Sequence, residues 1–206
     1  MKLLIIGGGA IADCNHIPSA KKELGVENIV LAEPNPQQTE KLKKKHGLVN
    51  VVSDYHEALP LVDACIICTP PHIHNAILKD CIAAGKHVLC EKPLSPSSAE
   101  TKEIIKNAPK NLILGMCHSY RFMSSRIEVR QMIKDGFFGD NVSIRIHEGD
   151  PSDWPTVSGY CFRKELVPGG AFYDNGIHSA DFLLWCFGAP DSIDYDDDAM
   201  GGRMFL

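Results

Sequence analysis

The turn after the first apolar run has the residue types of a phosphate-binding loop. The run Leu3 to Ile6 precedes a glycine cluster in which Gly7 would let the chain turn sharply and Gly9 would let a pyrophosphate approach the main chain. Ala12 would let a helix pack closely on the strand, and free N–H groups at the start of that helix would hold phosphate. Glu33 ends the next apolar run about twenty residues on, where an adenosine ribose would lie. This spacing predicts a dinucleotide-binding turn.

Ionisable residues gather in two further places. Glu91 and Lys92 follow the fifth apolar run, where a strand end would deliver a charged pair into a ligand cleft, although a lysine there is also compatible with an ordinary surface. Asp174, His178 and Asp181 stand at i, i+4 and i+7, so that a helix would place all three on one face. Spacing alone leaves open whether that face forms a reaction site or meets water.

Two patterns that resemble metal sites fail on geometry. Cys65 and Cys68 have the spacing of a zinc or redox pair, but residues three apart in a strand point to opposite faces. The alternating Asp194, Asp196 and Asp198 lack the later residues of a calcium loop. We therefore expect core thiols, a solvated acidic segment and no metal. In a chain with no export signal we expect the cysteines to be reduced.

Composition excludes several classes of function. The chain has 206 residues, 44% of them hydrophobic, and a net charge of −5, distributed as +1 over residues 1–120 and −6 over residues 121–206. A nucleic-acid binder needs a concentrated basic face, which neither part has. The first apolar run is too short for a signal peptide and no run reaches membrane-spanning length. We expect a cytoplasmic protein without a nucleic-acid or membrane partner.

Apolar runs alternate with helical patterns through residues 1–120. Such alternation predicts an α/β fold with a doubly wound parallel sheet covered by helices on both faces. The expected strands are Leu3 to Ile6, Ile29 to Glu33, Asn50 to Ser53, Ala64 to Thr69, His87 to Cys90 and Leu112 to Met116, and the expected helices include Pro36 to His46, His72 to Ala84 and Ser97 to Ala108.

Residues 121–206 predict a second, partial α/β domain. We expect a helix at Ser124 to Lys134, a strand at Val142 to His147, a helix at Phe172 to Phe187 and a short strand near Ser192 to Tyr195. So few strands would leave sheet edges and an apolar helix side uncovered. We therefore expect a homo-oligomer, or a stable first domain with a more labile second one.

Five motifs in order resemble the Gfo/Idh/MocA family (glucose-fructose oxidoreductase, inositol dehydrogenase and rhizopine catabolism). They are GGGAIA from Gly7, TPPHIH from Thr69, EKP from Glu91, YRF from Tyr120 and GGAFYDNGIHSAD from Gly169. The resemblance implies a Rossmann domain followed by an α/β domain with an open sheet through which members commonly pair. Family members run well beyond 206 residues, so we expect this chain to be truncated in its C-terminal domain.

The resemblance implies an NAD(P)-dependent oxidoreductase that transfers a hydride to or from a secondary hydroxyl of a sugar, cyclitol or derivative. Lys92, Asp174 and His178 match the residues that members use around the reacting hydroxyl, with His178 as acid/base. NAD is expected in preference to NADP because Glu33 would repel a 2′-phosphate. The expected cofactor contacts are Gly7, Gly9, Ala10, Ile11, Ala12, Glu33, Thr69, Pro70, His74, Glu91 and Lys92. Alternatives are an NAD-dependent glycosidase and a non-catalytic dinucleotide-binding protein.

Overall fold

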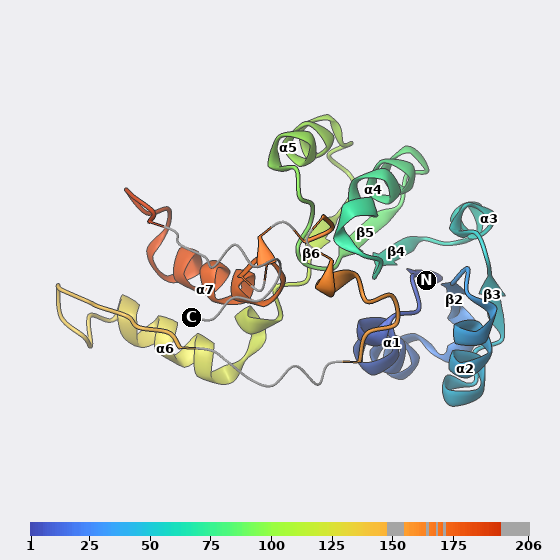
Figure 1. Ribbon diagram of the computed structural model, residues 1–206, viewed down its shortest axis with the longest axis horizontal. Coiled ribbons are helices and arrows are strands. Elements are labelled where there is room, and N and C mark those ends of the chain that lie inside the picture. The colour runs from blue at the N-terminus through green and yellow to red at the C-terminus, as the bar shows by residue number, and fades with distance from the viewer. Residues whose placement is uncertain (148–154, 164, 168, 171, 195–206) are drawn as a thin grey trace. The chain divides into compact units, whose positions relative to one another are not determined.

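The chain divides into two compact units (Figure 1). The computed structural model describes residues 1–147, 155–163, 165–167, 169–170 and 172–194. Unit 1 comprises Met1–Cys117 and Trp154–Tyr160, and unit 2 comprises His118–Asp153 and Cys161–Leu206. A single boundary is expected at residue 120 from the sequence, whereas unit 1 also includes Trp154–Tyr160.

A six-stranded parallel sheet forms the centre of unit 1. Its strand order is β3-β2-β1-β4-β5-β6, which is the doubly wound order of dinucleotide-binding sheets and confirms the predicted fold class. The expected strands are all present, with ends within two residues of the prediction. They are β1 (Leu3–Ile6), β2 (Ile29–Ala32), β3 (Asn50–Val52), β4 (Ala64–Ile67), β5 (His87–Cys90) and β6 (Leu114–Met116).

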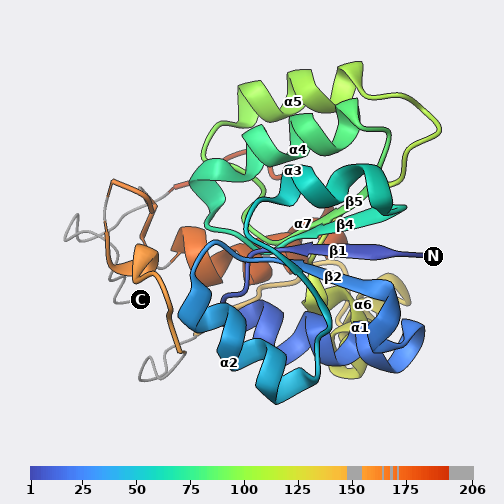
Figure 2. The same ribbon diagram turned by 90° about the vertical axis from the view of Figure 1, so that its right-hand side faces the viewer.

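Helices cover both faces of this sheet (Figure 2). Helices α1 (Ile17–Leu24) and α2 (Pro36–His46) lie on one face, and α3 (Tyr55–Ala58), α4 (His74–Ala83) and α5 (Ser98–Asn107) lie on the other. Successive side chains of a strand alternate between faces, so Leu3 and Ile5 join one buried cluster while Leu4 and Ile6 join the other. Cys65 and Cys68 also fall in opposite clusters, which confirms that their sulfurs do not converge.

Local signals set the helix ends. Asn35 caps α2 by accepting hydrogen bonds from two backbone N–H groups of its first turn, and Gly47 ends the helix with φ +71°. Ser97 caps α5 by accepting from the N–H of Glu100 at 3.3 Å. No helix in the described parts of the chain has the length and apolarity needed to cross a membrane.

Helices dominate the described part of unit 2. They are the 3₁₀ turn η5 (Ser119–Phe122), α6 (Ser124–Lys134) and the π-helical turn η7 (Phe172–Gly176), which leads into α7 (Ile177–Phe187); a further 3₁₀ turn, η6 (Tyr160–Phe162), spans the unit boundary. These bear out the predicted helices at Ser124 to Lys134 and Phe172 to Phe187.

The expected strand at Val142 to His147 is wrong. Those residues form no strand ladder with any described residue. Alternating apolar residues produce a strand only where another strand supplies hydrogen bonds, and here Val142 and Ile144 instead line a hollow beside α6. Residues 192–194 are not a strand either, and Tyr195, Asp196 and Asp198 lie outside the described residues.

Candidate functional site

The glycine turn after β1 requires Gly7 and leaves space at Gly9. Gly7 has φ +96°, and a Cβ there would lie 3.0 Å from the main-chain carbon and oxygen of Cys68. A Cβ on Gly9 would meet nothing within 4 Å. Ala10 and Ile11 begin the helical segment that continues through Ala12, so their N–H groups lie at its start. The turn therefore combines a fixed bend with the room and the donors that a pyrophosphate needs.

Glu33 is fixed beside this turn. One carboxylate oxygen accepts from the N–H of Gly8 at 2.7 Å, and the other accepts from the N–H of Asn35 at 2.8 Å. The side chain of Gln38 donates to the carbonyl of Gly8 at 2.5 Å. Each Glu33 oxygen keeps a further lone pair for a ligand hydroxyl. The carboxylate thus has a set position next to the open space at Gly9.

His74 is buried and contacts main-chain carbonyl oxygens of two loops. The ring is 0% exposed, so none of it is open to a ligand in this structure. Nε2 lies 2.7 Å from the carbonyl oxygen of Thr69, and Nδ1 lies 3.1 Å from that of Pro93 and 3.2 Å from that of Leu94. Burial lowers the pKa of His74, and the three carbonyls oppose this effect. His74 therefore ties the loop after β4 to the loop after β5, where a direct cofactor contact was expected.

The hydroxyl of Thr69 fits a polar ligand. Its Oγ1 is buried and has no hydrogen-bond partner among the described residues, while Pro70 follows it at the carboxyl end of β4. A buried hydroxyl without a partner costs free energy unless something binds it. Together with the space at Gly9, this atom favours a bound polar group at the carboxyl edge of the sheet.

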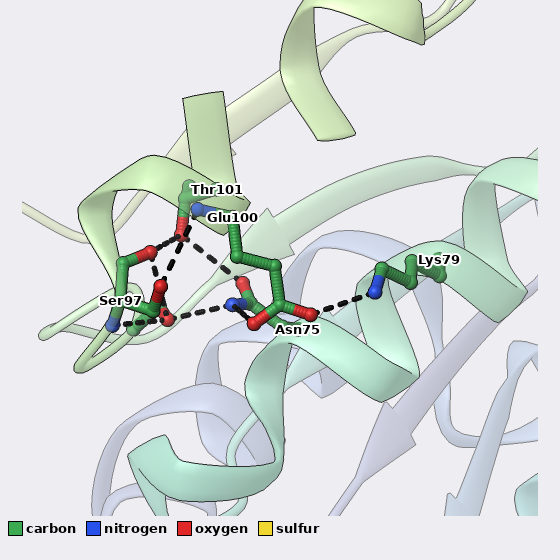
Figure 3. Close-up of polar contacts among 6 residues, drawn as sticks. Asn75, Lys79, Ser97, Glu100 and Thr101 are labelled. Atoms are coloured by element: carbon green, nitrogen blue, oxygen red, sulfur yellow. Dashed lines mark hydrogen bonds and ion pairs between the residues drawn. The ribbon is translucent and has the colours of Figure 1, made fainter. Parts of the chain in front are cut away.

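Asn75, the residue after His74, is hydrogen-bonded to Glu100 and Thr101 of α5 (Figure 3). Its Nδ2 donates to Ser95 Oγ and to Glu100 Oε2, both at 2.7 Å, and its Oδ1 accepts from Thr101 Oγ1 at 3.1 Å. Asn75 is only 7% exposed, so these bonds are shielded from water. The first turn of α4 therefore holds the whole segment from residue 93 to residue 101, directly after Lys92.

Glu91 is buried in a cluster with His16 and Cys117. Its Oε1 lies 2.7 Å from His16 Nε2, its Oε2 accepts from the N–H of Lys92 at 3.1 Å, and the thiol of Cys117 donates to the same carboxylate. Burial alone would raise the pKa of Glu91, but these hydrogen bonds and His16 outweigh it and lower the pKa. Burial, with the adjacent carboxylate, raises the pKa of the Cys117 thiol. Glu91 is thus an ionised anchor for the half-buried Lys92.

His178 lies against an aromatic ring in unit 2. It is 8% exposed and stacks on Tyr120 with ring centroids 4.5 Å apart and an interplanar angle of 16°. His118 meets its edge at 6.3 Å. Asp174 lies in η7, one turn earlier, and is partly exposed. These contacts restrict the rotation of the imidazole, which suits a group that must exchange a proton at a fixed place.

Asp181, the third residue of the expected polar face, is already paired. Arg121 donates to both of its carboxylate oxygens, at 2.8 and 2.7 Å, and His118 Nδ1 lies 3.6 Å away. Asp181 is only 8% exposed, so its carboxylate is largely shielded from water. Its hydrogen bonds with the guanidinium raise the pKa of Arg121. Asp181 therefore joins α7 to η5, while Asp174 and His178 remain the candidate reactive groups.

A separate hollow of about 280 Å³ lies elsewhere in unit 2. Its walls come from α6, from residues 142–146 and from Phe182 of α7, and they are mainly apolar. Asp174 and His178 do not line it. It is therefore not part of the candidate reaction site.

Sequence reasoning missed the residues that support the site. His16 and Cys117 reach Glu91 from far away in the chain, and Arg121 reaches Asp181 across 60 positions. No spacing rule connects such distant positions. Only the order of the strands and helices brings them together.

Comparison with known proteins agrees with this geometry. Residues 1–116 match the family model described as "Oxidoreductase family, NAD-binding Rossmann fold", and residues 127–200 match the "GFO/IDH/MocA C-terminal domain". The chain is 28% identical over 191 residues to myo-inositol 2-dehydrogenase of Thermotoga maritima, covering 91% of this chain and 55% of that protein. It is 26% identical over 196 residues to D-glucoside 3-dehydrogenase of Escherichia coli, covering 92% and 55%.

Solved structures show the same similarity. Scyllo-inositol dehydrogenase of Lactobacillus casei with bound NAD(H) and scyllo-inositol superposes with a TM-score of 0.71 at 25% identity, covering 91% of this chain and 56% of that one. A probable dehydrogenase of Thermotoga maritima gives a TM-score of 0.74 at 25% identity, covering 98% and 61%. This chain spans about half the length of the curated relatives that it matches. With matches to both of its domain models, the chain belongs to the Gfo/Idh/MocA family of oxidoreductases.

Proposed function

We propose that the protein is an NAD-dependent oxidoreductase that transfers a hydride between nicotinamide and a secondary hydroxyl of a sugar, cyclitol or derivative. The observation that carries the proposal is the glycine turn with open space at Gly9 and a fixed carboxylate, Glu33, beside it. The relative whose structure contains NAD(H) and scyllo-inositol supports the substrate class. The motif lysine, aspartate and histidine at Lys92, Asp174 and His178 support the reaction type.

The proposed chemistry needs a base for the hydroxyl proton and a donor for the developing negative charge on oxygen. His178 would take that proton, because imidazole has an ordinary pKa of about 6.5 and exchanges protons near neutrality. Lys92 would donate a hydrogen bond to the same oxygen and stabilise alkoxide character. Asp174 would orient the substrate or the imidazole. The bound nicotinamide would supply the hydride acceptor over the carbinol carbon.

The chain's own residues also support a preference for NAD over NADP. Glu33 is held in place by the N–H groups of Gly8 and Asn35, so it cannot move aside without breaking two hydrogen bonds. Its carboxylate can accept hydrogen bonds from ribose hydroxyls but would repel a 2′-phosphate. One relative, the scyllo-inositol 2-dehydrogenase IolW of Bacillus subtilis, is named for NADP(+), so the preference is a property to be measured for each member.

A substrate screen tests the proposal. The purified protein would be incubated with NAD or NADP and a panel of cyclitols and monosaccharides, and reduced cofactor would be followed by its absorbance. We expect reduction of NAD with at least one polyol, loss of that activity in Lys92→Met, and a narrower preference for NAD in Glu33→Ala. Release of sugar from glycosides without net reduction of NAD, or NAD binding without turnover on any polyol, would instead support the glycosidase or the non-catalytic alternative.

A further inference from the structure

We propose that His16, Glu91 and Cys117 form a binding site for one Zn²⁺ ion in unit 1. These residues offer an imidazole nitrogen, a carboxylate oxygen and a thiol sulfur, and the three atoms lie within 4.8 Å of one another. Imidazole nitrogen, carboxylate oxygen and thiolate sulfur are the three types of protein atom that bind zinc. The ion would take no part in the proposed hydride transfer, which requires no metal, although Glu91 directly precedes Lys92 in the chain.

The geometry needs only a small adjustment. Zinc bonds of about 2.0–2.3 Å place tetrahedral ligand atoms roughly 3.5 Å apart. His16 Nε2 and Glu91 Oε1, now 2.7 Å apart as a hydrogen-bonded pair, would separate slightly to admit the ion. The other oxygen of Glu91 already accepts from the N–H of Lys92, which fixes the carboxylate as an orienting hydrogen bond fixes a metal ligand. Three protein ligands would leave the fourth position for water.

The surroundings favour a dipositive ion. The side chains of His16 and Glu91 are 14% and 11% exposed, so the site is sheltered but open enough for an ion to enter. Carboxylate and thiolate together would neutralise Zn²⁺, and a buried ion is tolerated where its charge is compensated. Zinc binds the thiolate form of cysteine, so coordination by Cys117 would displace the thiol proton, which would pass to the buffer.

Two other thiols of unit 1 belong to the hydrophobic core. Cys68 and Cys90 are buried, and each packs in one of the two apolar clusters. Neither is among the three residues whose donor atoms lie within 4.8 Å of one another.

A calorimetric titration of the reduced, tag-free protein with ZnCl₂ tests the site. We expect one ion per chain with proton release, seen as a heat that depends on the buffer's ionisation enthalpy. Titration with CoCl₂ should give the visible bands of tetrahedral Co²⁺ and a thiolate charge-transfer band. Cys117→Ser should abolish that band and weaken zinc binding at least about tenfold, and His16→Gln should weaken it comparably. The matched control is Cys14→Ser, which removes an exposed thiol from the helical segment that also contains His16.

The outcomes separate cleanly. Absence of saturable zinc binding by the unsubstituted protein overturns the proposal, as does a Cys117→Ser variant that binds zinc as tightly as the parent. Equal weakening in Cys14→Ser also overturns it, because the ion would then be held by exposed thiols. Circular dichroism melting of each variant shows whether it is folded.

Discussion

The glycine turn makes a paired prediction about stability and binding. Replacing Gly7 by alanine puts a Cβ 3.0 Å from main-chain atoms of Cys68 and 3.1 Å from Thr69 Cγ2, at φ +96°. The left-handed conformation costs a residue with a Cβ about 1–2 kcal/mol, and overpacking adds about 1–3 kcal/mol. Because the close neighbours include backbone that cannot move aside, we expect Gly7→Ala to lower the free energy of unfolding by about 2–5 kcal/mol.

Gly9→Ala is the matched variant. Its Cβ would meet nothing within 4 Å, and its backbone is not in the left-handed region, so the free energy of unfolding should stay within about 0.5 kcal/mol of the parent or rise by up to about 1 kcal/mol. The added methyl would occupy the space assigned to the pyrophosphate. We therefore expect NAD affinity to fall at least about tenfold, which corresponds to about 1.4 kcal/mol.

Urea unfolding followed by circular dichroism and calorimetric titration with NAD measure the two quantities separately. The two variants should differ in which property they lose. Gly7→Ala should lose stability, and Gly9→Ala should lose affinity for NAD while remaining as stable as the parent. A stable Gly9→Ala protein that binds NAD as tightly as the parent would refute the placement of the pyrophosphate at this turn. A Gly7→Ala protein as stable as the parent would refute the steric argument.

Three further predictions concern other parts of the chain. Lys92→Ala and His178→Ala should each reduce turnover by about 10²- to 10⁴-fold in steady-state assays while leaving NAD affinity nearly unchanged. If either variant keeps a near-normal rate, the substituted residue has no role in the reaction. Asn75→Leu removes three hydrogen bonds made by a buried amide and should lower the free energy of unfolding by about 1–3 kcal/mol, whereas Lys79→Met breaks an exposed ion pair and should lower it by less than about 1 kcal/mol. Equal effects in urea unfolding would contradict this. Asp13 is 7% exposed, and although burial alone would raise its pKa, its hydrogen bonds and ion pairs with Lys45 and His46 lower it. Asp13 therefore stabilises the fold above its ordinary pKa of 3.8, and this contribution is lost as the pH falls through the lowered pKa. The difference in free energy of unfolding between the parent and Asp13→Asn should decrease as the pH is lowered; an increase would contradict this.

Much of unit 1 could be predicted from the sequence because its strands and helix ends are specified by short stretches of neighbouring residues. The run Leu3 to Ile6 is apolar at every position, as expected for a strand that is covered on both faces, and Gly7 ends it. Caps such as Asn35 and Gly47 mark the ends of α2 within the chain itself. The fold class followed from the alternation of such segments.

The rest depended on contacts that only the fold creates. His74 was expected to face the cofactor because it follows a strand end, but helix α4 begins at this residue and turns the ring inward onto main-chain carbonyls. Asp181 shares a helix face with His178, yet Arg121 neutralises it from a distant segment. Val142 to His147 has the alternation of a strand without a described neighbour to pair with. In each case a local pattern was insufficient to fix what the residues contact in the folded chain.

These contacts change how variants at the candidate cofactor site should be interpreted. Glu33, His74 and Glu91 each bind main-chain groups of the loops at the carboxyl edge of the sheet, so each holds backbone as well as offering a side chain. Because His74 is fully buried, a loss of NAD affinity in His74→Ala would measure the displacement of Thr69 and of the segment after Lys92, and not a lost contact with the ligand. Preorganised loops bind more tightly because ordering them costs free energy on binding. The affinity of this edge therefore depends on its buried connections as well as on the residues that a ligand touches.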